Sequence, residues 1–326
     1  MIKDSIKIGN LELSTRIVLP PMATEKSDDG KVTDALCQYY KDRAQNPFVG
    51  MIISEHMYIS KRGQASRGQL SIADDFVIEG LKKLNQIIHE TDPQIKTFAQ
   101  INHAGLKTKS ELTGFEASGP SQADSHKCKG NAFSLSEIPE IVDLFVKAAI
   151  RVKKAGFDGV EIHSAHGYLL NQFYSPLINK REDEYGPQSI ESRLKIHKEI
   201  IEKIREALGP DYPIIVRLGG SDYEEGGSTE SDAVKAAKLL ESYGVDMIDV
   251  TGGMNGYLTH NTHTYGYFTE MSQKISQAVT IPVLSTGGVT TLDQAEEILT
   301  SGKADLVGIG RALYQDPNWG LNKEED

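Results

Sequence analysis

Short apolar runs alternate with amphipathic stretches along most of the chain. Eight apolar runs have the length of buried strands, namely Arg16–Leu19, Met51–Ser54, Lys96–Ile101, Gly159–His163, Ile214–Leu218, Met247–Val250, Val283–Ser285 and Leu306–Ile309. Apolar positions at helical spacing lie between them, at Asp34–Ala44, Asp75–Glu90, Glu137–Ala155, Ile190–Leu208, Ser231–Tyr243 and Leu292–Thr300. Strands that alternate with helices in this way predict an α/β fold with a parallel sheet.

The predicted parallel sheet could be open and doubly wound, or closed into a (β/α)8 barrel. Alternating apolar residues from Ile6 to Leu13 flank the turn pair Gly9-Asn10, which predicts a β-hairpin that could plug one end of a barrel. No GxGxxG motif follows the first predicted strand, and 326 residues suit one barrel. We therefore predict an α/β fold, a (β/α)8 TIM barrel with an N-terminal β-hairpin cap, with residues 1–326 as a single domain.

Composition and charge narrow the classes of partner. The formal charge is −11, from 35 basic and 46 acidic residues, whereas a nucleic-acid partner needs a basic surface. The two cysteines, Cys37 and Cys128, lack metal-type spacing, which argues against a disulfide framework or an iron–sulfur cluster. There is neither a membrane-length apolar run nor a signal-peptide pattern. We expect a cytoplasmic protein with a small-molecule substrate and no nucleic-acid or membrane partner, and a homo-oligomer stays open.

The longest irregular stretches follow the third and fourth predicted strands, at Asn102–Ser136 and Ser164–Ser189. Loops of this length inside a compact domain usually carry function. In a barrel, both loops would extend from the carboxyl ends of strands, where active sites of this fold are built.

Two glycine-rich segments follow the seventh and eighth predicted strands. Gly287-Gly288 comes after the seventh strand, and Gly310-Arg311 comes after the eighth. Loops at these positions commonly bind phosphate in barrels through backbone N–H groups, and an arginine can pair with the phosphate oxygens. We interpret the two segments together as a phosphate site, which does not by itself identify the ligand.

The fourth predicted strand ends at His163, and His166 and Tyr168 follow it. The motif has three interpretations. A metal site is possible, although no third ligand stands at ligand spacing, and we predict none. The histidines could instead form a structural hydrogen-bonded pair. In the third interpretation, two imidazole N–H groups hold an oxygen on which negative charge develops, and Tyr168 donates a proton.

At these residues the sequence resembles the Old Yellow Enzyme family of FMN-dependent ene-reductases, and most closely its short bacterial branch without an iron–sulfur domain. The most specific segment is GFDGVEIHSAHGYLLNQFYSPLINKREDEYGPQSIESR, which spans Gly156–Arg193. Supporting motifs are RIVLPPMAT from Arg16, QINHAG from Gln100, VRLGGSDY from Val216 and LVGIGRALYQDPNW from Leu306. The similarity covers nearly the whole chain.

The resemblance implies a set of FMN contacts. The implied residues are Pro20, Pro21, Met22, Ala23, His56, Gln100, Arg217, Gly287, Gly288, Gly310 and Arg311. Gln100 would contact the pyrimidine end of the flavin, and Arg217 would stabilise the negative charge of the reduced flavin near N1. The two glycine-rich segments with Arg311 would hold the phosphate. Residues Pro20–Ala23 would lie along one side of the flavin ring.

The resemblance also implies an activity, that of an NADH- or NADPH-dependent oxidoreductase that reduces activated C=C bonds in enones, enals or nitroalkenes. His163 and His166 would bind the carbonyl or nitro oxygen, FMN N5 would deliver hydride, and Tyr168 would protonate the neighbouring carbon. Two alternatives stay open. One is the same FMN barrel acting on another substrate class, by amine demethylation or dienoyl thioester reduction, and the other is a non-catalytic flavin-binding or sensing protein.

The sequence departs from the family pattern at several positions near the implied site. Ala23 replaces a frequent Thr or Cys, Glu25 replaces a substrate-contacting Tyr of some relatives, and His56 stands where a small residue often meets the flavin edge. Leu106 takes the place of an Arg and is followed by Lys107. These departures leave the substrate range open.

Other polar residues lie near the predicted strand ends and are further candidates for the pocket. We expect Glu55 to face the mouth of the barrel as an ordinary strand-end carboxylate. The loop residues that could line or roof the pocket are Tyr257, His260, His263, Tyr265 and Tyr267.

Overall fold

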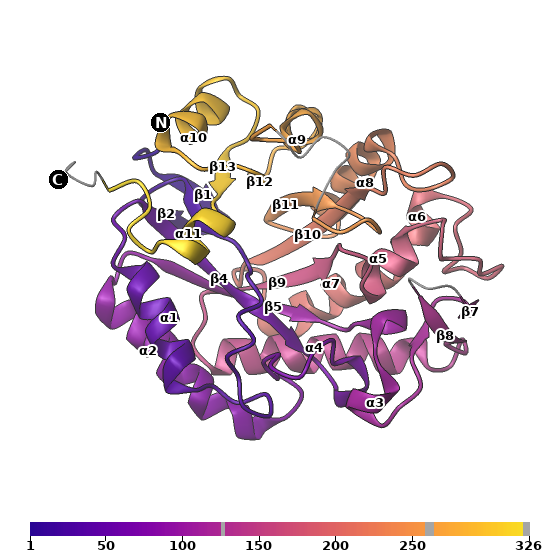
Figure 1. Ribbon diagram of the computed structural model, residues 1–326. Helices are drawn as coiled ribbons and strands as arrows, with labels where there is room; N and C mark the ends of the chain where they lie inside the picture. Colours follow the sequence, from indigo (N-terminus) through magenta and orange to yellow (C-terminus); the bar gives the residue numbers. More distant parts are fainter. Residues whose placement is uncertain (125–127, 258–263, 322–326) are drawn as a thin grey trace.

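Eight parallel strands close into a barrel in the computed structural model, which describes residues 1–124, 128–257 and 264–321 (Figure 1). The barrel strands are β3 (Ile17–Leu19), β4 (Val49–Tyr58), β5 (Lys96–Asn102), β9 (Gly159–Ser164), β10 (Ile214–Ser221), β11 (Met247–Gly252), β12 (Val283–Thr286) and β13 (Leu306–Gly308). Each strand pairs with its neighbours in chain order, and β13 pairs with β3 to close the ring. The predicted (β/α)8 barrel and all eight predicted strands are confirmed.

Helices surround the barrel (Figure 1). They are α1 (Asp34–Ala44), α2 (Ile78–Thr91), α3 (Ser110–Thr113), α4 (Ile138–Lys154), α5 (Leu169–Tyr174), α6 (Ile190–Arg193), α7 (Lys195–Leu208), α8 (Glu230–Ser242), α9 (Thr269–Ser276), α10 (Leu292–Thr300) and α11 (Arg311–Gln315). The apolar faces of the longer helices are buried against the strands. Among the described residues, no helix combines the length and apolar character needed to cross a bilayer.

Threonine caps fix where several outer helices begin. The hydroxyls of Thr33, Thr229 and Thr291 each accept a hydrogen bond from a backbone N–H in the first turn of α1, α8 and α10. These side chains satisfy N–H groups that have no partner inside the helix. The caps explain why the predicted starts of these helices agree with the structure to within a residue.

Two predicted boundaries need correction. The segment Ile190–Leu208 was predicted as one helix, but α6 ends before Leu194 and α7 begins after it. Leu194 has φ −96° and ψ 3°, which departs from helical geometry and separates the two helices. Strand β4 also continues well past its predicted end, and it carries Glu55 and His56 inside the strand.

The lower part of the barrel interior is an apolar cluster closed by the N-terminal hairpin. The cluster consists of Ile8, Leu13, Val18, Met51, Ile53, Phe98, Ile215, Met247, Leu284 and Leu306. Ile8 lies in β1 (Ile6–Ile8) and Leu13 in β2 (Leu11–Leu13), which pair antiparallel. Both side chains are fully buried, so the predicted plug is confirmed.

Gly159 at the start of β9 makes room for an aromatic ring in this lower cluster. A Cβ atom at Gly159 would lie 2.1 Å from Cε1 of Phe98. The ring of Phe98 therefore fills the space that a side chain of β9 would otherwise occupy, and the barrel interior stays densely packed.

A small three-stranded sheet is inserted between β5 and β9. It contains β6 (Ser118–Gly119), β7 (Ala123–Asp124) and β8 (Lys129–Ala132). Arg181, in the loop between α5 and α6, attaches this sheet to that loop, because its guanidinium donates to the carbonyls of Pro120 at 2.9 Å and Phe133 at 2.6 Å. The long loops after β5 and β9 are thus ordered against each other at the same end of the barrel.

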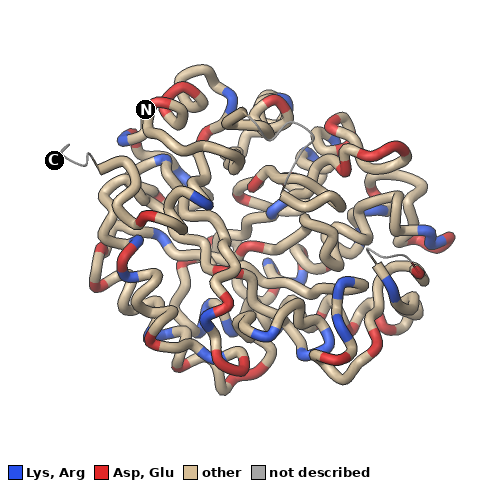
Figure 2. The backbone as a smooth tube through the Cα atoms, in the orientation of Figure 1, with Lys and Arg blue, Asp and Glu red and all other residues tan. Residues whose placement is uncertain are grey.

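Charged residues of both signs are interspersed over the outer helices and loops, as Figure 2 shows. This distribution is the solvated acidic surface expected from the net charge of −11. The charges inside the barrel are few, and they lie at the functional end described next.

Candidate functional site

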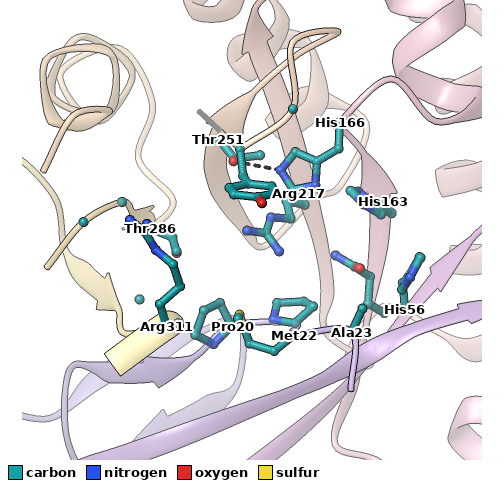
Figure 3. Close-up of a pocket in the computed structure, with 18 of the residues that line it drawn as sticks. Pro20, Met22, Ala23, His56, His163, His166, Arg217, Thr251, Thr286 and Arg311 are labelled. Atoms are coloured by element: carbon teal, nitrogen blue, oxygen red, sulfur yellow. Dashed lines mark hydrogen bonds between the residues drawn. The ribbon is translucent and has the colours of Figure 1, made fainter. Parts of the chain in front are cut away.

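A cavity of about 820 Å³ opens at the carboxyl ends of the barrel strands. The residues predicted for the site all line it: Pro20, Pro21, Met22, Ala23, His56, Gln100, His163, His166, Tyr168, Arg217, Gly287, Gly288, Gly310 and Arg311. These residues come from segments spread over nearly the whole chain. Figure 3 shows the labelled members of this set arranged around one open space.

One side of the cavity is apolar. Pro20, Pro21, Met22 and Ala23 follow the carboxyl end of β3 and line the cavity. In the view of Figure 3, Pro20, Met22 and Ala23 lie along its base. Because two consecutive prolines have restricted backbone angles, this side is a rigid surface. A flat apolar ring can pack against such a surface without desolvating polar groups.

The end of the cavity near β12 and β13 suits an anion. Arg311 extends into the open space beside Thr286, opposite the histidines (Figure 3). A Cβ atom on Gly287 or Gly288 would lie within 2.9 Å of the ring of Tyr267, so only glycine allows the backbone to pack there. Arg311 and the glycine backbone together provide the charge and the close approach that a phosphate group requires.

The opposite end of the cavity holds Gln100 and Arg217, both buried. Nε2 of Gln100 donates a 2.7 Å hydrogen bond to Oε1 of Glu161, which leaves the carbonyl of Gln100 free to accept from a ligand. Nε of Arg217 lies 3.1 Å from Oδ2 of Asp249. The amide and the guanidinium are therefore held from behind by two carboxyl groups that sequence reasoning did not identify.

His163, His166 and Tyr168 form a compact group above the cavity. The ring centroid of His163 lies 5.0 Å from that of His166 and 5.2 Å from that of Tyr168. Burial and the nearby charge of Arg217 hold the pKa of both imidazoles well below the usual value, so both are neutral at neutral pH. Burial raises the pKa of Tyr168, which keeps its hydroxyl protonated. Among the described residues, no group of three potential ligands is placed to hold a metal ion.

The loop that presents His166 has an unusual backbone. His166 has φ +58° and Gly167 has φ +71°, both in the left-handed region. The carbonyl of His166 accepts a 2.6 Å hydrogen bond from Lys107, and the N–H of Gly167 donates to Asn171 at 2.7 Å. These contacts offset the strain of a non-glycine residue in this conformation, of order 1 kcal/mol. The imidazole of His166 is further oriented by Thr251, whose hydroxyl lies 3.0 Å from Nε2.

His56 adds a third imidazole with a defined tautomer. Its Nδ1 lies 3.2 Å from Nε2 of Gln69 and 3.1 Å from Nδ2 of Asn102. Oε1 of Gln69 accepts from the backbone N–H of Ala65, which fixes the orientation of the amide and makes its nitrogen the donor. Nδ1 of His56 must therefore accept, and the proton resides on Nε2. Burial lowers the pKa of His56 to about 4, so the ring is a neutral donor stacked 5.4 Å from Tyr168.

Glu55 and Glu25 lie in different environments. Glu55 is not the strand-end carboxylate that was predicted, because it lies inside β4, is buried outside the cavity lining, and accepts a hydrogen bond from the hydroxyl of Thr24. Burial raises the pKa of Glu55 to about 7. Glu25 is exposed, and its carboxylate accepts from the N–H of Gly68 at 2.9 Å, so it ties two loops together at the rim.

The candidate roof residues divide into three groups. Tyr257 and Tyr267 line the cavity, and Tyr267 also packs on the glycine backbone near β12. Tyr265 is 37% exposed and donates to a glutamate of α10, so it does not reach the cavity. His260 and His263 lie outside the described residues.

The cavity as a whole fits FMN. It provides an anion-binding end at Arg311, a rigid apolar side, and a hydrogen-bonding end at Gln100 and Arg217. A phosphorylated flat ring system with a polar edge matches this order of groups, whereas a small metabolite would leave one end of the cavity without a partner.

A family model describes the same chain at the level of sequence. The model of the NADH:flavin oxidoreductase / NADH oxidase family matches residues 4–325. The chain belongs to this family. Membership confirms the predicted relationship to the Old Yellow Enzyme family.

Curated relatives of the family support the assignment. An "NADH oxidase" of Thermoanaerobacter brockii is 38% identical over 328 residues, which cover 98% of this chain and 50% of that protein. A "metal reductase" of Desulforamulus reducens is 40% identical over 317 residues, covering 95% of this chain and 47% of that protein. The chain thus spans about half the length of these relatives.

Solved structures agree in fold. A 2-naphthoyl-CoA reductase in complex with 2-naphthoyl-CoA has a TM-score of 0.91 at 26% identity, covering 97% of this chain and 51% of that one. An Old Yellow Enzyme homologue from Zymomonas mobilis has a TM-score of 0.83 at 26% identity, covering 97% of this chain and 90% of that one. The barrel, with its loops, is therefore the common framework of these proteins.

Proposed function

We propose that the chain reduces activated C=C bonds, as found in enones, enals and nitroalkenes, with electrons from NADH or NADPH. The observation that carries the proposal is the group His163, His166 and Tyr168, because it combines two neutral imidazoles with a protonated phenol in one cavity. A protein that only binds flavin has no need for a proton donor at this place.

In the proposed complex, FMN would lie along Pro20–Ala23, with its phosphate at Arg311 and its polar edge at Gln100 and Arg217. The bound FMN would supply hydride chemistry, which protein side chains lack. His56 would contribute its Nε2–H at the edge of the same ligand. These roles rest on the match between the cavity and the cofactor, group by group.

The remaining residues would act on the substrate. N–H donors of His163 and His166 would bind the carbonyl or nitro oxygen and stabilise the negative charge that grows on it. Tyr168, which stays protonated because of its burial, would donate a proton from its hydroxyl to the carbon next to the activating group. Thr251 and Lys107 would hold His166 in place through its ring and its carbonyl.

A second candidate substrate class is an unsaturated or aromatic acyl thioester. A structural neighbour is a reductase in complex with such a thioester, and its TM-score of 0.91 is accompanied by 26% identity. The thioester carbonyl could use the same two imidazole donors, so the chemistry would be shared and only the entrance to the cavity would need to differ.

The test is an anaerobic absorbance titration of the purified protein. NADH or NADPH should bleach the flavin band, and 2-cyclohexenone should restore it. If the flavin band returned only with an unsaturated acyl thioester, the second substrate class would replace the first. A flavin that bleaches but recovers with neither would contradict both, and a protein that cannot be loaded with FMN would contradict the proposed cofactor site.

A further inference from the structure

A layer of buried polar side chains lies directly beneath the polar end of the cavity. Gln100, Glu161, Arg217 and Asp249 come from β5, β9, β10 and β11, which are consecutive in the barrel. The strand register places Gln100 opposite Glu161 and Arg217 opposite Asp249. Glu161 and Asp249 are completely buried. Neither carboxyl group lines the cavity, so both act through the two residues that do.

The two carboxyl groups hold the cavity-facing residues in different ways. Glu161 accepts from Nε2 of Gln100 at 2.7 Å, and this contact determines which end of the amide faces a ligand. Asp249 lies beside Arg217, with 3.1 Å between Oδ2 and Nε. Each carboxyl group is thus a positioning residue for one contact of the proposed FMN site.

The carboxyl groups also have unused hydrogen-bonding capacity. Oε2 of Glu161 and both carboxyl oxygens of Asp249 lack a hydrogen-bond partner among the described residues. Two ionised carboxylates and one guanidinium would leave a net negative charge in a region sealed from water, which is costly. One proton on the pair makes the group of three neutral.

The surrounding charges favour such a proton. Burial, together with the neighbouring carboxyl of Asp249, raises the pKa of Glu161 well above its usual value. Burial also raises the pKa of Asp249, and the guanidinium of Arg217 opposes this. Among the described residues, Arg217 is the charged group that acts on both carboxyl groups, and Gln100 is the neutral neighbour of Glu161.

We propose that Glu161 and Asp249 form one proton-holding site that takes up a second proton when FMN bound next to Arg217 is reduced. The inference rests on the proposed FMN site. Reduction by NADH or NADPH adds two electrons and one proton to the cofactor, which leaves one additional negative charge. A proton from solvent then forms an O–H bond with the remaining carboxylate, no bond in the protein breaks, and the net charge of the buried region is unchanged.

The physical reason is electrostatic coupling at low dielectric. A new negative charge near Arg217 weakens the stabilisation that Arg217 gives to the neighbouring carboxylate, and it repels that carboxylate directly. Both effects raise the affinity of the pair for a proton. The pair therefore exchanges a proton with solvent while the flavin itself stays anionic.

The experiment measures the midpoint potential of protein-bound FMN against pH, around neutral pH. The wild-type protein should take up two protons per two electrons, with a reduced-flavin spectrum of the anionic type. The double variant Glu161→Gln, Asp249→Asn should take up one proton per two electrons. A variant with the wild-type pH slope would overturn the proposal, as would a neutral reduced-flavin spectrum in the wild type.

Two further variants keep the test decisive. Glu161→Gln alone retains an oxygen that can accept from Gln100, so it should fold and bind FMN even if the double variant does not. The carboxylate of Asp249 then remains beside Arg217, so this variant should still take up two protons per two electrons, and uptake of one proton would overturn the shared site. Glu55→Gln removes another buried carboxyl with a raised pKa and should keep the wild-type slope. If only the Glu55 variant lost the two-proton dependence of the midpoint potential on pH, the second proton would be assigned to Glu55 instead. Wild-type protein that cannot bind FMN would contradict the proposed function, whereas a one-proton slope with FMN bound would contradict only this inference.

Discussion

The lower and upper halves of the barrel interior are built from the same strands but differ completely in chemistry. Phe98, Ile215 and Met247 belong to the lower apolar cluster. Two residues further along each of these strands stand Gln100, Arg217 and Asp249, which are polar and lie at or just beneath the cavity. A step of two residues moves a side chain about 7 Å along the same face of a strand. Stability and chemistry are thus separated along the barrel axis over a very short distance.

The largest expected effect concerns the upper half alone. In the double variant His163→Ala, His166→Ala, the rate at which an enone reoxidises the reduced protein should fall by about 10²–10³-fold, since the donors to the developing charge are lost. FMN content should stay unchanged, and the spectral change on binding a phenol should disappear. Stopped-flow absorbance measures the rate, and a wild-type rate in this variant would refute the proposed oxygen-binding role.

The lower half should respond in the opposite way. Phe98→Ala removes a fully buried ring and should lower the free energy of unfolding by about 3 kcal/mol or more, while FMN affinity changes little. Equilibrium denaturation and fluorescence titration with FMN give the two quantities. Gly159→Ala is the matched variant, because its new Cβ would clash with the ring of Phe98. A loss of FMN affinity without a loss of stability would contradict the division between the two halves.

Acid sensitivity should not come from the lower apolar cluster, because that cluster contains no titratable side chain. His197 is buried behind β9, where its Nε2 lies 2.7 Å from the hydroxyl of Ser164, and burial lowers its pKa to about 3. The unfolded chain binds a proton at this residue below about pH 6.5 and the folded chain does not, so stability falls as the pH falls.

From about pH 7.5 to about pH 5, His197 should account for about 2 kcal/mol of the loss in unfolding free energy. Urea denaturation of wild-type protein and of His197→Gln at both pH values measures this contribution as a difference of differences. An equal pH dependence in the two proteins would show that His197 is protonated in the folded state.

The smallest expected effect tests a contact within the upper half. Thr251→Val removes the hydroxyl that lies 3.0 Å from Nε2 of His166 and should slow enone-dependent reoxidation about fivefold, equivalent to about 1 kcal/mol. Thr251→Ser keeps the hydroxyl and should remain close to wild type. Equal rates in both variants would mean that the turn around His166 alone orients the imidazole.

The sequence allowed prediction of the barrel because its strands and helices have distinct periodicities and because several helix starts carry local caps. The predicted site residues all line one cavity, since they lie in or just after the carboxyl-terminal parts of barrel strands. The split at Leu194 was not predictable, because the apolar spacing continues through it. The prediction for Glu55 was wrong for a related reason, because the sequence did not show that β4 continues past this residue.

The buried carboxyl groups were missed although a signal was present. Glu161 and Asp249 each have apolar residues on both sides within a predicted strand, and buried parallel strands are usually apolar throughout. An acidic residue at such a position indicates a partner inside the barrel. The partners Gln100 and Arg217 lie on other strands, so only the three-dimensional register brings these pairs together.

In the part of the chain that the structure describes, the hairpin plug closes the lower end of the barrel, so ligands of the cavity at the other end would share its mouth. FMN bound against Pro20–Ala23 would occupy the deeper part of the cavity, and the nicotinamide and the substrate would enter above it through the same mouth. Molecules that share one opening are released in reverse order of arrival. The residence time of the cofactor therefore depends on how often the position above it is vacant, and substrate-like ligands that bind the histidines should also retain the flavin.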